Sequence, residues 1–218
     1  MSVAAALLSP LLLGLLSLLQ LGVLAFALRR APWAALRAVP QRLHLLFGAL
    51  LALLFVWSIT GPVGPHVSLH VLGMTTVTLL LGPSLAVVVG TAALALLALL
   101  GGIEPRTILA NAVLTVSLPV AVTALLLQLA LRHAPRNPFV YMLGVGFAGG
   151  ALSMLAVLLV MLGLFALAGS GGTPREWAPP VLLLTMFPEG FINGALVSSL
   201  AVYKPHWLLT FDERHFLD

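Results

Sequence analysis

Long apolar runs, most of them close to the length that crosses a lipid bilayer, are the feature that most constrains the fold of this chain. A spanning helix needs about 20 mostly apolar residues, and shorter ones are tolerated within bundles. Of the 218 residues, 61% are hydrophobic and only 7% are charged, which is too little charge to cover a water-soluble domain of this size. The chain is therefore predicted to be a single integral membrane domain over residues 1–218, an all-α polytopic helix bundle.

The apolar runs number about seven. They cover residues 3–28, 43–60, 66–81, 83–100, 107–131, 138–168 and 179–203. The third and fourth are short and meet at Gly82-Pro83, where proline removes a backbone donor and ends the preceding helix. The alternative, one kinked helix over 66–100, would be about 50 Å long and overshoot the hydrocarbon core, so two helices are preferred. The sixth run is too long for one perpendicular span, and its Gly146 and Gly150 form a small-xxx-small pair that favours close helix packing.

Arginine and lysine are unevenly divided between the two sides that seven spans create. With the amino terminus outside, eight of the ten basic residues fall in inner segments, as the positive-inside rule requires. The inner set is Arg29, Arg30, Arg37, Arg42, Arg132, Arg136, Lys204 and Arg214, and the outer loops hold Arg106 and Arg175. The sequence therefore predicts an external amino terminus, a cytoplasmic carboxyl terminus and a multi-pass location in the inner (plasma) membrane.

The sequence offers no recognisable catalytic or nucleotide-binding pattern. Lys204 is the only lysine, and no glycine-rich stretch leads to Gly-Lys-Ser/Thr, so the chain has no P-loop. No nucleophile, base and orienting group stand together, and the absence of cysteine excludes thiolate metal sites. A formal charge of +4 is too small to indicate nucleic acid. We therefore expect a non-enzymatic protein that contacts the lipid bilayer and not nucleic acid.

Histidine and methionine stand out in the third run because ionisable groups at membrane depth are costly and usually functional. His66, His70 and Met74 are spaced i, i+4 and i+8, which would place them on one face of a helix. Imidazole suits nickel, cobalt, copper or zinc, and a thioether adds softness, so these three residues are candidate metal ligands. The structural alternative is that His66 is wetted at the interface while His70 hydrogen-bonds to a neighbouring helix.

Three more polar side chains lie at membrane depth. Glu189 and Asn193 form an i, i+4 pair that follows Pro188, in the first turn of the last helix or a little deeper, where a helix dipole favours a carboxylate. Asn111 lies early in the fifth helix and can bond across helices. We expect these three residues to line a polar ligand pocket with His66 and His70. The alternative for Glu189 is a helix-start carboxylate with no ligand role.

Several segments, taken in order, resemble the CbiM/NikM family of substrate-binding permease subunits in energy-coupling-factor transporters for cobalt and nickel. The stretch "HVLGMTTVTLLLGPSLAVVVG" is similar to that family's His-Leu-Leu-Gly and Leu-Leu-Leu-Gly-Pro region. "LANAVL" resembles its Gly-Ala-Asn segment, and "EGFINGALVSSLAVYKPHWL" resembles its Glu-Gly-containing last helix. The opening "MSVAAALLSP" aligns without a gap with the family's Met-His-Ile-Pro-Asp-Gly-Phe-Leu-Ser-Pro.

The resemblance implies a metal site built around the amino terminus. In that family the terminal amine and the second residue supply nitrogen ligands, together with the histidine that corresponds to His70. Ser2 stands where the family has histidine, and Ala4, Ala5 and Ala6 replace its Pro-Asp-Gly. The amino-terminal part of the metal motif is therefore degenerate. Either His66 supplies the missing nitrogen beside His70, or the fold is kept while its ligand is changed or lost.

The resulting interpretation is a permease subunit for transition-metal uptake, with cobalt, nickel or another transition metal as its substrate. The resemblance implies a transmembrane coupling subunit and ATPase subunits as partners, since this chain has no nucleotide motif. The alternative is a non-transport membrane subunit of the same fold that acts as a scaffold or assembly factor in another membrane complex.

Overall fold

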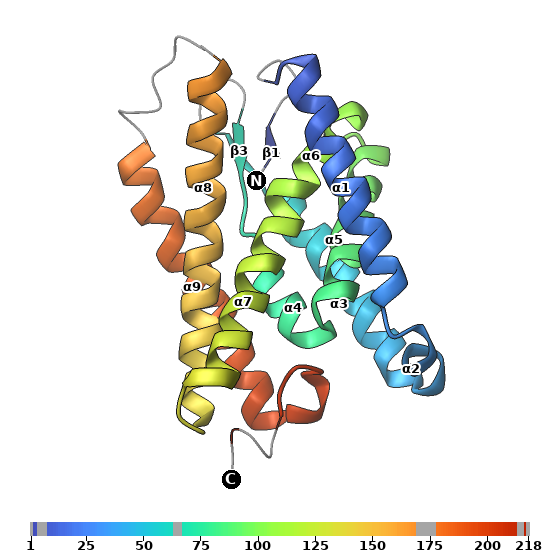
Figure 1. Ribbon diagram of the computed structural model, residues 1–218, viewed down its shortest axis with the longest axis vertical. Helices are drawn as coiled ribbons and strands as arrows, with labels where there is room; N and C mark the ends of the chain where they lie inside the picture. Colours follow the sequence, from blue (N-terminus) through green and yellow to red (C-terminus); the bar gives the residue numbers. More distant parts are fainter. Residues whose placement is uncertain (1, 4–7, 63–66, 169–177, 213–215, 217–218) are drawn as a thin grey trace.

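A computed structural model of the protein describes residues 2–3, 8–62, 67–168, 178–212 and 216 (Figure 1). Within those residues, four helical segments are long and apolar enough to cross a membrane, namely Pro10–Arg30, Pro40–Ser58, Pro105–His133 and Val140–Leu164. Large apolar side chains such as Leu11, Leu18 and Phe26 point outward from the bundle, as expected for a surface solvated by lipid. The predicted all-α membrane helix bundle is confirmed.

The described regular elements are a series of helices and one small three-stranded sheet. The α-helices are α1 (Pro10–Arg30), α2 (Trp33–Ala38), α3 (Pro40–Ser58), α4 (Met74–Leu81), α5 (Pro83–Leu99), α6 (Ile108–Ala112), α7 (Leu118–His133), α8 (Ala148–Ala168) and α9 (Ala178–Tyr203). Short 3-10 helices are η2 (Pro105–Thr107) and η5 (Pro205–Trp207), and π-helical stretches are η3 (Val113–Ser117) and η4 (Val140–Phe147). The strands are β1 (Ser2–Val3), β2 (Gly61–Pro62) and β3 (Val67–Leu69).

The first helix begins later than its apolar run suggests. Ser9 is the N-cap of α1, and its Oγ accepts a hydrogen bond from the backbone N–H of Leu12 at 3.3 Å. Pro10 occupies the first helical turn, where its missing N–H costs nothing. Val3, which the apolar run includes, instead forms β1 with Ser2. The helix start is therefore set by the Ser-Pro pair and not by the apolar run.

The predicted third helix over residues 66–81 is wrong in its first half. Val67–Leu69 is a strand that pairs antiparallel with both β1 and β2, in the order β1-β3-β2. The helix begins only at Met74, after Gly73 with a φ of +66°, and ends at Gly82 with a φ of +82°. Non-helical backbone at membrane depth is tolerated where protein surrounds it, and Figure 1 shows β1 and β3 among α6, α7 and α8.

The break between the third and fourth runs lies where the sequence predicts it. α4 ends before Gly82, and Pro83 opens α5 as a separate helix. α5 runs through the interior and contacts both α1 and α3. Most of its side chains are buried, as expected for a helix that is apolar on all sides. α4 is only eight residues long, so at about 1.5 Å per residue it is too short to cross the hydrocarbon core by itself.

The continuous helical stretch of η4 and α8 approaches α9 closely through glycines. Gly146 lies against Val197, and Gly150 lies against the Glu189 carbonyl and Asn193. On α9, Gly190 and Gly194 lie against Phe147 in turn. The predicted small-xxx-small pair therefore meets a second pair on α9, and this double contact fixes the depth at which α9 presents its polar side chains.

Basic residues gather at one end of the bundle. Arg30 at the end of α1 and Arg42 near the start of α3 line one cavity with the Gly82-Pro83 turn and Thr210. Figure 1 shows α2 and the carboxyl terminus at this same end. The arrangement agrees with a single basic face, as the positive-inside rule would produce.

Reporter fusions test the orientation of this basic end. A reporter joined after Arg37, in α2, is expected to show a cytoplasmic location, and one joined after Gly102, beyond the far end of α5, an external one. The reason is that eight of the ten basic residues fall in the segments assigned to the inner side. Paired alkaline-phosphatase and fluorescent-protein fusions measure both locations. Two fusions reporting the same side would contradict the proposed membrane topology.

Candidate functional site

His70 lies on the buried loop that joins β3 to α4. Its side chain is 8% exposed, and its ring centroid lies 5.4 Å from that of Trp57 on α3. The Nδ1 atom lies 2.9 Å from the Val71 carbonyl oxygen, which favours the tautomer with the proton on Nδ1. In that tautomer Nε2 is the ring nitrogen that can coordinate a metal, which binds the neutral imidazole.

Trp57 fixes the loop from the side of α3. Its indole N–H donates to the Leu72 carbonyl at 3.0 Å, and its side chain is 2% exposed. A buried tryptophan N–H normally requires such an acceptor. The sequence analysis did not single out Trp57, although a tryptophan inside an apolar helix implies a buried partner for its N–H. The loop next to His70 is thus held by both ring contact and hydrogen bonding.

Glu189 holds the same loop from the side of α9. Its two carboxylate oxygens accept the backbone N–H groups of Leu72 and Gly73 at 2.7 and 2.8 Å. The side chain is 1% exposed. Gly73 is the N-cap of α4, so this carboxylate occupies the positive end of the α4 dipole. The expected favourable helix end is present, but it belongs to α4 and not to α9, in which Glu189 lies well inside.

Asn193 extends this anchor by one helical turn. Its Nδ2 donates to the Glu189 carboxylate at 2.7 Å, and its Oδ1 accepts the Thr76 backbone N–H at 2.9 Å and the Thr76 hydroxyl at 2.7 Å. Glu189 and Asn193 together satisfy three backbone donors at the start of α4. Thr76 completes the network and was not anticipated from the sequence.

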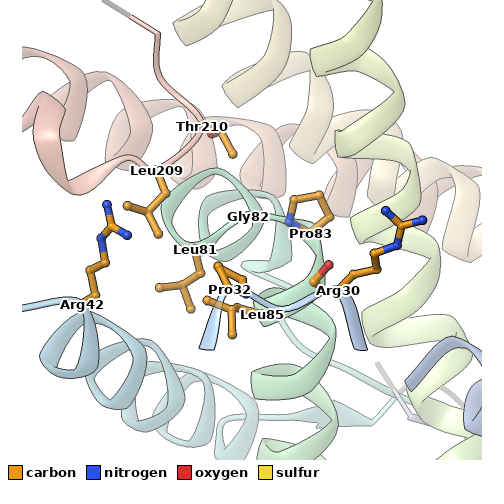
Figure 2. A pocket seen from close by; sticks show the side chains of 10 residues that line it. Arg30, Pro32, Arg42, Leu81, Gly82, Pro83, Leu85, Leu209 and Thr210 are labelled. Atoms are coloured by element: carbon orange, nitrogen blue, oxygen red, sulfur yellow. The ribbon is translucent and has the colours of Figure 1, made fainter. Parts of the chain in front are cut away.

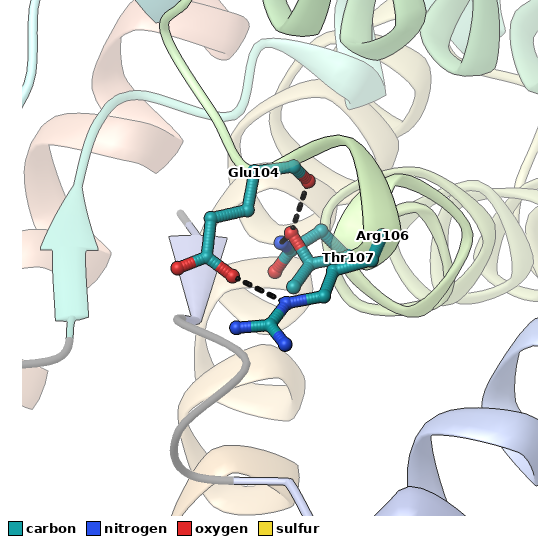
Figure 3. A network of polar contacts seen from close by, with 4 residues as sticks. Glu104, Arg106 and Thr107 are labelled. Carbon is teal, nitrogen blue, oxygen red and sulfur yellow. Dashed lines mark hydrogen bonds and ion pairs between the residues drawn. The ribbon is translucent and has the colours of Figure 1, made fainter.

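Asn111 lies on α6, close to the other side of the loop. It is 2% exposed, and its Nδ2 donates to the Thr107 hydroxyl at 3.0 Å. Figure 3 shows how Thr107 is held in turn: its hydroxyl donates to the Glu104 carbonyl at 2.8 Å, beside the Glu104–Arg106 ion pair. Ala110, next to Asn111 on α6, belongs to the same apolar cluster as Leu72. Apolar packing therefore places α6 against the loop, and the polar contacts hold the start of α6 itself.

The spacing that put His66, His70 and Met74 on one helical face is not realised, because the helix begins at Met74. His66 lies outside the described residues. Met74 is fully buried in the apolar cluster around α5, and its terminal methyl lies close to Gly90. The alternation of Val67, Ser68 and Leu69 is the signal that favours a strand here over a helix.

The amino-terminal strand reaches the same place. β1 pairs with β3 so that Ser2 lies opposite Ser68, two residues before His70. Among the described residues, no three histidine, aspartate or glutamate side chains gather closely enough to hold a metal ion. Within the described chain, the candidate site therefore consists of His70 on an anchored loop, the backbone of the first residues and the surrounding polar network.

Buried ionisable groups around irregular backbone at membrane depth are typical of membrane proteins that bind a substrate for transport. Comparison with known families agrees. Residues 3–207 match the CbiM family, described as the cobalt uptake substrate-specific transmembrane region, and the chain belongs to this family. No curated protein and no solved structure matches the chain. The membership confirms the family suggested by the sequence motifs and places the chain among membrane proteins of metal-ion transport.

Proposed function

We propose that the protein is the substrate-specific permease subunit of an energy-coupling-factor importer for cobalt, nickel or a related transition metal in the inner membrane. The match of residues 3–207 to the CbiM family carries this proposal. A transmembrane coupling subunit and ATPase subunits are its proposed partners, because the sequence contains no P-loop to bind nucleotide. The proposal assigns the metal ion as the substrate and not as a resident cofactor.

The proposed metal ligands are His70 and His66, with Met74 as the least favourable member of the set. His70 is buried on an anchored loop, and its Nδ1 faces the Val71 carbonyl, so Nε2 is the nitrogen that can coordinate a metal. β1 brings the backbone of Ser2 within two residues of His70, which supports a contribution from the amino terminus as in the family. The Met74 methyl packs toward α5. Asn111, Glu189 and Asn193 form the polar surroundings that position the loop.

Metal binding by purified protein tests this assignment. His70→Ala is expected to weaken cobalt or nickel binding at least tenfold, because it removes a proposed imidazole ligand. His133→Ala is the matched control, since His133 is exposed at the end of α7. Isothermal titration and elemental analysis measure the metal. Equal metal binding by wild type and the His70→Ala variant would contradict the site.

One observation favours a second function. Ser2 and the alanines after it cannot reproduce the terminal chelate that the resemblance implies, which suits a scaffold or assembly role in another membrane complex. Ser2→Ala is expected to leave binding unchanged if His66 has replaced the missing ligand. Purification of the native complex separates the two functions: coupling and ATPase subunits indicate transport, whereas no bound metal and a different set of subunits indicate the scaffold.

A further inference from the structure

A cavity of about 410 Å³ opens at the basic end of the bundle, away from His70. It is bounded by the end of α1, the start of α3, the turn between α4 and α5, and the chain after η5. Figure 2 shows Arg30 and Arg42 on opposite sides of this cavity, with Gly82 and Pro83 between them. The nearest apolar walls include Leu81 and Leu85.

Within the described residues, neither Arg30 nor Arg42 has an anionic partner. The ion pair found there is Arg106–Glu104, which does not line this cavity. The guanidinium of Arg30 instead lies 5.4 Å from the centre of the Phe26 ring. Pro83 starts α5 at the cavity, so the unpaired N–H groups of that helix's first turn add partial positive charge. Two arginines and the amino end of α5 therefore border one hollow, with the two guanidinium groups at its opposite sides.

The cavity lies where two membrane spans end. Pro10–Arg30 finishes there and Pro40–Ser58 begins nearby, and both are long and apolar enough to cross a bilayer. Phe26, one turn before Arg30, is largely exposed on the lipid-facing surface. A group bound between the arginines would thus lie at headgroup depth, with apolar side chains below it. Basic pockets between spanning helices at this depth suit the headgroups of anionic lipids.

We propose that this cavity binds the phosphate headgroup of an anionic phospholipid. Its walls are fixed, because the Thr210 hydroxyl donates to the Leu79 carbonyl at 2.7 Å and lies 2.8 Å from the Tyr141 hydroxyl. The backbone N–H of Leu209 also donates to the Leu80 carbonyl at 3.1 Å. The chain after α9 is thereby tied to α4, and the lipid joins it to α1 and α3. This inference is independent of the metal proposal.

Lipid binding by the purified protein tests the proposal. Native mass spectrometry titrates dioleoylphosphatidylglycerol and dioleoylphosphatidylcholine against the wild type, the Arg30→Gln/Arg42→Gln double variant and an Arg132→Gln/Arg136→Gln control of equal charge change. The first double variant is expected to bind phosphatidylglycerol roughly thirtyfold more weakly, given the usual contribution of two basic residues at an anionic membrane surface. The control is expected to stay within about threefold of wild type, and phosphatidylcholine binding should not distinguish the three proteins.

Several outcomes would overturn it. Equal losses in the two double variants would show general electrostatic attraction and no defined site. Stabilisation by inorganic phosphate that equals stabilisation by phosphatidylglycerol, measured as a shift in Tm, would indicate a site for a free anion. The Arg30→Gln single variant, which keeps one guanidinium, is expected to show about half of the logarithmic loss. An unchanged affinity in both the single and the double variant would exclude the cavity as the lipid site.

Discussion

Replacing Glu189 with alanine is expected to lower the free energy of unfolding by roughly 3 kcal/mol or more. The substitution leaves the backbone N–H groups of Leu72 and Gly73 buried without acceptors, and each such loss costs about 1–3 kcal/mol. It also removes the negative charge from the start of α4. Glu189→Gln is expected to fall between wild type and alanine, because an amide offers one acceptor oxygen where two are used.

The matched control is Glu104→Ala. Glu104 is 47% exposed and pairs with an exposed arginine, so its loss should cost under about 1 kcal/mol. Unfolding in mixed detergent measures stability, and amide hydrogen exchange at Leu72 and Gly73 reports the loop itself. Rapid exchange is expected at both amides in the Glu189 variants. Equal stability of Glu104→Ala and Glu189→Ala would contradict the anchoring role.

The second large effect is expected where α9 contacts η4 and the start of α8. A Cβ at Gly194 would lie 2.8 Å from the Cβ of Phe147, and one at Gly190 would lie 2.9 Å from the Phe147 carbonyl oxygen. Because backbone cannot move aside cheaply, Gly190→Ala and Gly194→Ala should each destabilise the protein by about 1–3 kcal/mol. They should also weaken metal binding indirectly, since α9 carries the residues that hold the His70 loop.

Gly163→Ala is the control for this pair. Gly163 lies in α8 with no other atom within 4 Å of an added Cβ, so alanine there should be neutral or stabilising by up to about 1 kcal/mol, owing to its higher helix propensity. Thermal unfolding in detergent compares the three variants. A destabilised Gly163→Ala variant with unaffected Gly190→Ala and Gly194→Ala variants would refute the close contact.

Hydropathy predicted most of the spanning elements because it reports the solvent that a segment meets. The run over 43–60 corresponds to α3 (Pro40–Ser58), and the run over 83–100 corresponds closely to α5 (Pro83–Leu99). It failed at residues 67–73, because a segment surrounded by protein can be apolar without being helical. The pairing of β3 with β1 joins residues more than 60 positions apart, and no local pattern in the sequence specifies that contact.

The polar residues were predicted more readily than their roles. Their cost in a bilayer marks Glu189 and Asn193 as unusual in the sequence alone. Their partners are the backbone donors of Leu72, Gly73 and Thr76, which are exposed for bonding only because α4 starts there. The start of α4 at Met74 was not predicted, because the segment before it was expected to be helical. The sequence could therefore identify the Glu189 carboxylate as unusual but not the helix that it caps.

The distance along the chain between the loop and its anchor has a consequence for biosynthesis. The N–H of Leu72 leaves the ribosome 117 residues before the carboxylate that satisfies it. Until α9 enters the bilayer, the loop and the first turn of α4 lack their final acceptors and must be held by water, lipid headgroups or a membrane chaperone. The segment that carries His70 is therefore expected to become ordered only after the last helix is inserted, so a nascent chain halted before α9 should leave this segment open to aqueous labelling reagents.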